Sequence, residues 1–391
     1  MTISRRTFLR NSAGITIGAG SVFLAGASNL LGNPVNNKKK LVIIMARGGL
    51  DGLTAVPPSD SQQYFDARPN IVVKDPIKIT TDFALHPELR SFSRLWSKHQ
   101  AAIVHATNIP YTGRSHFDGQ NLMESGGRVP YKEKTGWLGR GIDEAGLEGI
   151  SVSLPIPLLL RGKNNSDSYF PSRLKKASDA TMALLTEHYK NDTNLKRAMD
   201  RIQNRPISMT EGMMGKTKNH KNFGFLSNIA GTQMTKENGP QVAIFEVFGF
   251  DTHAAQGGRK GLHGEKLSMI DDIFDGLKKS MGDQFKNTLV LTLTEFGRTL
   301  RENGGYGSDH GYGTAVLIAG GLIKKAQIYS DWPGLKSTNL FEGRDLLSTI
   351  DARSIYCSAM SICFGVEFKR LQEKVFWNEP LTDLTETLFN A

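Results

Sequence analysis

The sequence predicts an α/β fold, a three-layer sandwich in which helices cover both faces of a mainly parallel central sheet. Short apolar runs rich in β-branched residues alternate along the chain with longer segments of helical spacing. Strands that alternate with helices are typical of parallel sheets, because each pair of parallel strands needs a crossover connection. The 391 residues are 39% hydrophobic and include 41 glycines, which fits a soluble, loop-rich protein rather than a fibrous one.

Residues 1–32 have the character of a targeting segment. The stretch SRRTFLR (4–10) resembles a twin-arginine export signal, and a weakly apolar stretch follows at 13–31. Several glycines interrupt that stretch, whereas a membrane span needs about 20 mostly apolar residues. We therefore expect export by the twin-arginine translocase to the periplasm or the extracellular space, and a mature form without a stable membrane span.

Charge and cysteine content exclude two further classes. The formal charge of +10 falls to +7 without the three arginines of the signal segment, which contains no acidic residue. No basic helix with interleaved aromatic residues is visible, so we expect no nucleic-acid partner. Cys357 and Cys363 lie six residues apart in a predicted helix and therefore point about 240° apart around its axis. This geometry predicts two buried thiols and no disulfide.

The first half of the chain begins with a buried strand at Leu41–Met45, followed by Gly48, Gly49 and Asp51. Glycines allow a tight turn directly after a strand, where an open α/β sheet binds its ligands. The predicted elements that follow are a helix over 86–99, a strand over 101–106, a helix ending near 125, a helical piece from 136 and a strand-like run over 151–160 that prolines interrupt.

In the second half, a charged helical insertion is predicted over about 172–237, within a single domain that spans 33–391. The other predicted elements are strands over 241–248, 288–294 and 314–319, helices over 262–281 and 346–363, and a glycine-rich loop over 303–308.

Ligand-type side chains follow the strands of this predicted sheet, and the carboxyl ends of parallel strands meet at one edge. Carboxylate oxygens and imidazole nitrogens suit zinc or manganese. Two such ions about 4 Å apart can bind the attacking and leaving oxygens of a phosphoryl transfer, whereas a carboxylate–histidine pair without metal can perform acid–base chemistry. The candidates are Asp51, Ser115 with His116, Asp251 with His253, Glu295, and Asp309 with His310.

Each candidate also has a purely structural interpretation. Asp51 and Asp251 can cap turns, His116 can cap or pack at a helix start, and Glu295 can pair with Arg298. The remaining histidines are expected to be packing residues. The candidates support one another because all of them fall at strand ends of one sheet.

Several motifs taken together resemble the family catalogued as domain of unknown function 1501. They are the twin-arginine start, GGLDGL (48–53), GRSHF (113–117), ESGG, GWLGR, FDTH, TEFGR and SDHGYG. That family is similar to the alkaline phosphatase and sulfatase superfamily, whose members hold one or two divalent metals at strand ends.

The resemblance implies metal ligands. Asp51 corresponds to the first-strand metal aspartate, and Asp251 with His253 resembles one metal site. Glu295 stands where the superfamily commonly has an Asp-His or Asp-Asn pair, and Asp309 with His310 would supply the late histidine or rebuild that pair. The implied cofactor is one or two divalent ions, zinc or manganese.

The resemblance also implies a nucleophile at a helix start. Ser115 is the first candidate and Thr112 the rival, because Thr112-x-x-x-His116 matches a spacing in some superfamily phosphodiesterases; His116 would assist. Arg47 or Arg114 would hold the anionic group. The sequence contains no Cys-x-Pro-Ser-Arg stretch, so we do not expect the formylglycine mechanism of sulfatases. We expect an exported, metal-dependent hydrolase of a phosphate or sulfate ester in a small molecule or polymer. The alternative is a non-catalytic periplasmic binding or assembly protein.

Overall fold

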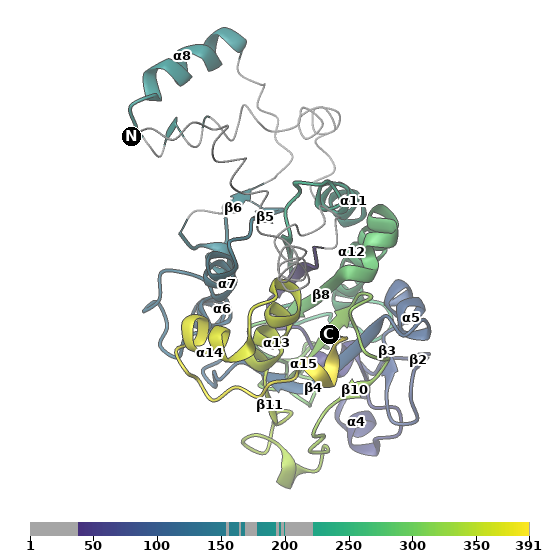
Figure 1. Ribbon diagram of the computed structural model, residues 1–391. Helices are drawn as coiled ribbons and strands as arrows, with labels where there is room; N and C mark the ends of the chain where they lie inside the picture. The colour runs from purple at the N-terminus through teal and green to yellow at the C-terminus, as the bar shows by residue number, and fades with distance from the viewer. Residues whose placement is uncertain are drawn as a thin grey trace, which may run out of the picture. The chain divides into compact units, whose positions relative to one another are not determined.

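The computed structural model describes residues 38–153, 156–163, 166–168, 178–192, 195–196, 199 and 222–390 (Figure 1). The twin-arginine segment and the methionines at 209, 213 and 214 lie outside these residues. Of the insertion predicted over 172–237, the described parts contain the helices α8 (Asp179–Tyr189) and α11 (Phe223–Met234). No helix of the described part is long and apolar enough to cross a membrane.

A mixed sheet organises the residues from 38 onward, in the order β10-β4-β9-β8-β1-β7-β5-β6, with β11 paired to β4. Neighbouring strands pair in parallel except around β9, which runs antiparallel to both β8 and β4. The strands are β1 (Lys40–Arg47), β4 (Ala101–Asn108), β5 (Gly149–Ser151), β6 (Ser166–Ser168), β7 (Val242–Phe248), β8 (Thr288–Leu293), β9 (Thr314–Ala319), β10 (Ile328–Tyr329) and β11 (Ile350–Asp351), and a separate hairpin pairs β2 (Ile77–Lys78) with β3 (Ala84–Leu85).

The central strand β1 is buried along its whole length, with its side chains divided between two cores. Leu41, Ile43 and Met45 belong to one core, and Val42, Ile44 and Ala46 belong to the other. Successive side chains of a strand point to opposite faces of the sheet, so a strand covered on both faces is apolar throughout rather than alternating. This pattern confirms the three-layer α/β prediction.

Two groups of helices build these cores. One core contains side chains of α6 (His116–Ser125), α7 (Trp137–Ala145), α13 (Ala352–Phe364) and α14 (Phe368–Phe376). The other contains side chains of α5 (Arg90–Ser97), α11 and α12 (Leu262–Met281), and α11 packs along α12. Shorter helices are α3 (Gly52–Ala55), α4 (Gln62–Ala67), α15 (Thr385–Leu388) and the 3-10 turns η1 (Leu158–Leu160), η3 (Gly282–Asn287) and η4 (Ser337–Asn339).

The direction of β9 decides which loops reach the site. Because β9 is antiparallel to β8, its first residue lies at the edge where β1, β7 and β8 end. The residues that precede β9 therefore join the residues that follow those strands. Cys357 and Cys363 are both buried free thiols, as the helical spacing predicts.

Candidate metal centre

The loop after β1 passes very close to the loop after β7. Gly48 has a φ of +113°, and a Cβ atom at this position would lie 2.5 Å from the backbone nitrogen of Asp251. Only glycine tolerates both this dihedral angle and this proximity. The glycine therefore lets the two strand-end loops meet, and places Asp251 at the sheet edge beside the end of β1.

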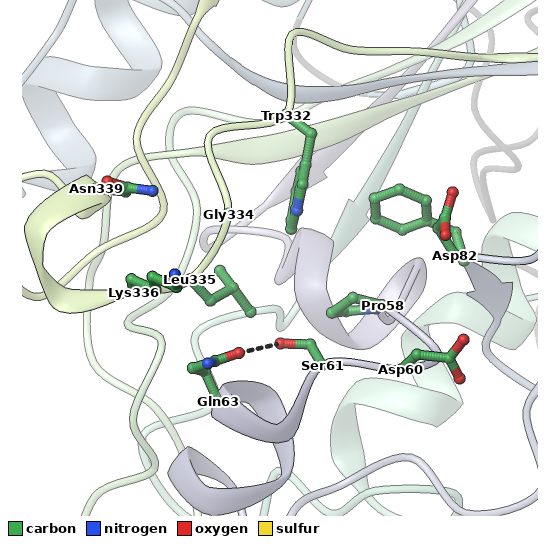
Figure 2. Close-up of a pocket in the computed structure, with 11 residues that line it drawn as sticks. Pro58, Asp60, Ser61, Gln63, Asp82, Trp332, Gly334, Leu335, Lys336 and Asn339 are labelled. Atoms are coloured by element: carbon green, nitrogen blue, oxygen red, sulfur yellow. Dashed lines mark hydrogen bonds between the residues drawn. The ribbon is translucent and has the colours of Figure 1, made fainter.

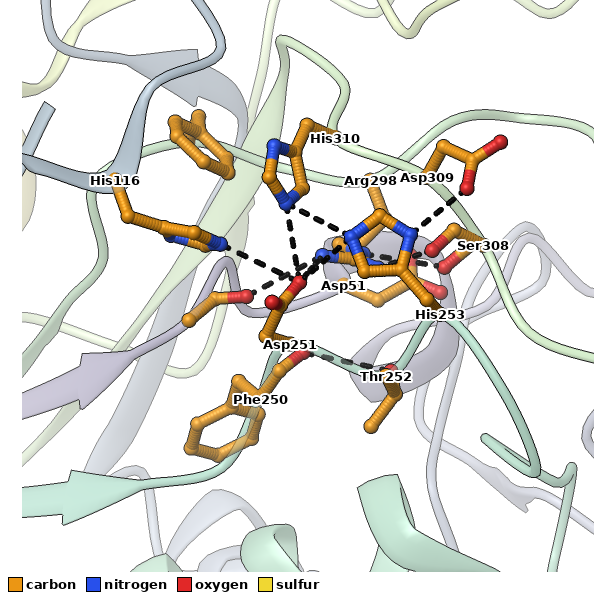
Figure 3. Close-up of polar contacts among 12 residues, drawn as sticks. Asp51, His116, Phe250, Asp251, Thr252, His253, Arg298, Ser308, Asp309 and His310 are labelled. Atoms are coloured by element: carbon orange, nitrogen blue, oxygen red, sulfur yellow. Dashed lines mark hydrogen bonds and ion pairs between the residues drawn. The ribbon is translucent and has the colours of Figure 1, made fainter.

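Three histidines converge on one carboxylate oxygen at this edge (Figure 3). The Nε2 atoms of His253 and His310 each lie 3.0 Å from Asp251 Oδ1, and His116 Nε2 lies 3.3 Å from the same atom. The Nε2 atoms of His253 and His310 are 2.9 Å apart. His116, Asp251 and His310 offer ligand atoms that all lie within 4.8 Å of one another. His253 adds a fourth ligand atom beside two of them.

The opposite nitrogen of each ring faces an atom that can only accept a hydrogen bond. A neutral imidazole whose Nδ1 donates must present a lone pair at Nε2, and such second contacts commonly orient metal-binding histidines. The three acceptors are Glu295 Oε1 for His116 at 2.8 Å, the Arg114 carbonyl oxygen for His310 at 2.7 Å, and Asp309 Oδ1 for His253 at 2.8 Å.

This arrangement fits a divalent metal ion. Three imidazole lone pairs and a carboxylate directed at one point repel one another unless a cation or added protons lie between them. His116 Nε2 is buried and makes no hydrogen bond, although it lies near Asp251. Ligand atoms about 2.0–2.1 Å from a tetrahedral ion are about 3.3 Å apart, close to the separations seen here. The imidazole nitrogens of this site suit zinc, and the carboxylate oxygen of Asp251 is a ligand that manganese also accepts.

Charged neighbours keep Asp251 ionised. Burial raises the pKa of Asp251, but the hydrogen bond from Arg298 and the contact with His310 outweigh this effect and bring the pKa down to about 2. Arg298 is fully buried, and its Nη1 lies 2.8 Å from Asp251 Oδ1. Burial lowers the pKa of His310, which favours the neutral ring that binds metals. Burial also lowers the pKa of His116, but its contacts with Glu295 and Asp251 raise that pKa above the ordinary value.

Asp51 lies outside this convergence. Its buried carboxylate accepts hydrogen bonds from Arg68 Nη1 at 2.6 Å, Thr54 Oγ1 at 2.7 Å, Gln256 Nε2 at 2.7 Å and the backbone nitrogen of Leu53 at 3.1 Å. Desolvation raises its pKa, but the guanidinium of Arg68 holds the net pKa far below the usual range. In this arrangement Asp51 caps α3 and neutralises a buried arginine.

Two other predicted ligands contact the histidines from behind. Glu295 is completely buried, and its Oε1 also accepts from the backbone nitrogen of Gly48 at 2.8 Å and from Gln120 at 2.9 Å. Asp309 is half-exposed and accepts from Asn303 Nδ2 at 2.9 Å besides His253. Burial raises the pKa of each carboxyl, but these hydrogen bonds bring it below its ordinary value.

The candidate nucleophiles differ in their surroundings. Ser115 caps α6, and its hydroxyl accepts a long hydrogen bond of 3.4 Å from the backbone nitrogen of Asp118. Thr112 is exposed, and among the described residues no hydrogen bond joins it to any of the three histidines. Ser115 therefore lies directly beside a residue of the centre, whereas Thr112 lies three positions further from it.

Both arginines predicted to hold an anion are bound to carboxylates. Arg47 is buried against Glu124 and Glu246, at 2.9 Å from the first. Arg114 pairs with Glu342 and, at 2.9 Å, with the fully buried Asp345. Arg344 also donates to Asp345 at 2.8 Å, and its Nη2 donates to the carbonyl oxygen of His310 at 2.6 Å. Asp345 thus pairs with two arginines that also contact His310. The backbone carbonyl of Arg114 contacts the ring Nδ1 of His310, and the side chain of Arg344 contacts its backbone carbonyl.

The sequence did not reveal the buried cation Arg68, and it suggested the wrong partner for Arg298. Arg298 stands three residues after Glu295 in the TEFGR motif, yet it pairs with Asp251 instead. Its guanidinium also donates to the hydroxyl and carbonyl oxygens of Ser308, from the glycine-rich loop. The position of Arg298 after β8 was the available signal. Arg68 is the C-cap residue of α4 and does not follow a strand, so no sequence pattern indicated its role.

A family model described as "Protein of unknown function (DUF1501)" matches residues 38–360. The chain belongs to this family. No curated protein matches it.

This DUF1501 member resembles several solved structures distantly. The PsFucS1 sulfatase from Pseudoalteromonas sp. is 12% identical, with 95% of this chain and 75% of that chain covered and a TM-score of 0.45. Ps i-CgsB in complex with k-i-k-neocarrahexaose is 11% identical, with coverages of 90% and 76% and a TM-score of 0.43. The alkaline phosphatase from the Antarctic bacterium TAB5 is 9% identical, with coverages of 88% and 99% and a TM-score of 0.38.

Proposed function

We propose that this protein is an exported, metal-dependent hydrolase of a phosphate or sulfate ester. Asp251, His116, His253 and His310 would hold a divalent ion, zinc or manganese. The observation that carries the proposal is the convergence of three Nε2 atoms on Asp251 Oδ1, with each opposite nitrogen fixed by an acceptor. Of the ligands expected from the sequence, Glu295 and Asp309 would act by orienting histidines, and Asp51 by neutralising Arg68.

A bound divalent ion would polarise the ester and stabilise charge on its oxygens. The chain itself would supply the orientation of the reacting group. Ser115 is our candidate nucleophile, because it caps α6 directly before the ligand His116 and, among the described residues, the only hydrogen bond recorded for its hydroxyl is the long one from Asp118. Thr112 remains the rival on the same segment.

Metal analysis and activity together test the proposal. Protein purified from its native host should contain a stoichiometric transition metal and should hydrolyse at least one member of a panel of p-nitrophenyl phosphate monoester, diester and sulfate. Asp251→Asn should lose both metal and activity. His99→Asn is the matched control, because His99 is exposed and outside the centre and asparagine tolerates its φ of 56°. Full metal content and turnover in Asp251→Asn would refute the assignment.

A second candidate function is a non-catalytic binding or assembly protein. The pairing of Arg47 and Arg114 with carboxylates favours it, because neither guanidinium is then free to bind an anionic ester. Stoichiometric metal without turnover of any panel ester would support this function. Substitution of Ser115 and of Thr112 by alanine separates the two nucleophile candidates if turnover is found.

A further inference from the structure

Two adjoining surface cavities extend away from the metal centre. The inner cavity, of about 290 Å³, is lined by Leu300, Arg301 and Arg344 among others. One of its lining residues, Arg344, contacts the centre, because its Nη2 donates to the carbonyl oxygen of His310 at 2.6 Å. The outer cavity, of about 430 Å³, shares Gln63 and Leu335 with the inner one as lining residues. The two cavities therefore form one track that begins beside the proposed reacting site.

The inner cavity carries positive charge. Its charged lining residues are Arg301, Arg344 and Asp66. Arg301 is exposed, and no ion pair is recorded for it among the described residues. Arg344 shares its charge with Asp345 while 42% of its side chain remains exposed. An anionic group next to the reacting ester would therefore find an unpaired guanidinium here.

The outer cavity has a different chemistry (Figure 2). Trp332 points toward Leu335 and Pro58, and it is fixed by edge-to-face contacts with Phe83 at 5.0 Å and with the buried His105 at 4.9 Å. The indole N–H has no hydrogen-bond partner among the described residues. Its charged lining residues are the exposed carboxylates Asp60 and Asp82 and one cation, Lys336. A rigid indole beside unpaired donors and acceptors is suited to a ring that is apolar on its face and polar at its edge.

We propose that this track binds an anionic polysaccharide and that the substrate of the centre is an ester group on such a polymer. A sugar unit packs its C–H face on Trp332 and donates hydroxyl hydrogen bonds to Asp60 and Asp82, while an anionic substituent of an intervening unit pairs with Arg301. The two carboxylates of the outer cavity outnumber its one cation, Lys336, so the sugar bound there carries no sulfate or phosphate. This inference rests on the proposed function, because the track is read outward from the proposed reacting site.

Binding of sulfated galactan oligosaccharides to the intact protein, measured by calorimetry, tests the inference without requiring turnover. We expect a hexasaccharide to bind at least tenfold more tightly than a disaccharide. Asp60→Asn with Asp82→Asn, and separately Arg301→Gln, should each remove most of this gain. Asp283→Asn and Arg90→Gln, at exposed positions away from the track, are the matched controls.

Polyphosphate of equal charge is the comparison ligand. Equal affinities for the disaccharide and the hexasaccharide would overturn the inference. It would also be overturned if polyphosphate bound as tightly as the hexasaccharide and if its affinity were unchanged in the Asp60/Asp82 double variant. Its failure is distinct from that of the proposed function. Turnover of a p-nitrophenyl ester without length-dependent binding removes the polysaccharide, whereas length-dependent binding without turnover of any ester removes the hydrolase. The melting temperature of each variant shows whether a loss reflects unfolding.

Discussion

The Nε2 atom of His253 lies 2.9 Å from the Nε2 atom of His310. Two imidazole nitrogens at this separation can share one proton or one metal ion, but two protons there would repel. Since the opposite nitrogens donate to Asp309 and to the Arg114 carbonyl oxygen, the pair is arranged for a cation between them.

Metal should stabilise the folded protein. An ion that binds only the native state at a free concentration 100 times its Kd adds about 2.7 kcal/mol to the free energy of unfolding. We expect zinc to raise the melting temperature of the metal-stripped protein, and a chelator to reverse the shift. Differential scanning calorimetry of wild type and Asp251→Asn checks this. An equal shift in both proteins would place the ion elsewhere.

The carboxylates behind the histidines should tune metal affinity. Glu295→Gln and Asp309→Asn keep the side-chain shape but remove the charge that orients His116 and His253, and such changes typically lower metal affinity by 10- to 100-fold. The larger loss is expected for Glu295, which is buried, than for the half-exposed Asp309. Competition for zinc with a chelating dye measures both, and Asp283→Asn serves as the control. Unchanged affinities would mean that the ring orientations have another origin.

Asp51 should matter for stability rather than for metal content. Removal of one partner of a buried ion pair leaves the other charge uncompensated, so Asp51→Ala should cost about 3–5 kcal/mol of unfolding free energy through Arg68. Urea unfolding followed by circular dichroism measures this cost. Metal analysis of the surviving folded fraction provides the second readout, because a ligand role for Asp51 would lower its metal content as well.

His105 should make the protein less stable below neutral pH. Burial lowers its pKa from 6.5 to about 4, and its Nδ1 accepts from the backbone nitrogen of Ala106 while Nε2 lies 3.0 Å from the Val56 carbonyl oxygen. The folded state therefore holds the neutral ring, whereas the unfolded state takes up a proton as the pH falls below 6.5. This contribution to stability is complete above pH 6.5 and is lost as the pH falls toward 4.

Between pH 7 and pH 5 that loss amounts to about 2 kcal/mol. Unfolding free energies of wild type and His105→Gln at the two pH values measure it. The difference between the two pH values should be smaller in the variant, which has no group to titrate at this position. An identical pH dependence in both proteins would assign the acid sensitivity to other buried histidines.

The five longest strands of the sheet were predictable from sequence because each is a largely apolar run of strand length bounded by glycine or polar residues, whereas the short strands β5, β6, β10 and β11 were not predicted. The runs at 41–45, 101–106, 241–248, 288–294 and 314–319 all appear as strands whose ends differ by at most two residues from the prediction. The direction of β9 was not predictable, since a run of buried residues does not encode the partner or the orientation of a strand. That direction explains how His310, which precedes its strand, reaches the same edge as Asp251, which follows one.

The site was predictable only as a set of residues. Strand ends gave Asp251, His253 and His310, and the helix start gave His116, but nothing local separates a ligand from the carboxylate that orients it. Asp51 and Asp251 both follow a strand in a glycine-containing loop, yet one faces Arg68 and the other faces three histidines. The two aspartates differ because Arg68, at the end of α4, pairs with Asp51, and the sequence around Arg68 contains no motif that would indicate this pairing.

Asp345 shows how far the order of this centre extends beyond its ligands. Its buried carboxylate never contacts His310, but it fixes Arg114 and Arg344, which hold the ring nitrogen and the backbone carbonyl of that histidine. The segment around Asp345 is therefore linked to His310 and to the residues just before α6 by a continuous set of hydrogen bonds. We expect amide hydrogen exchange over residues 341–346 to become slower when zinc is added to the metal-free protein. Unchanged exchange over these residues would show that the segment is already rigid without the ion.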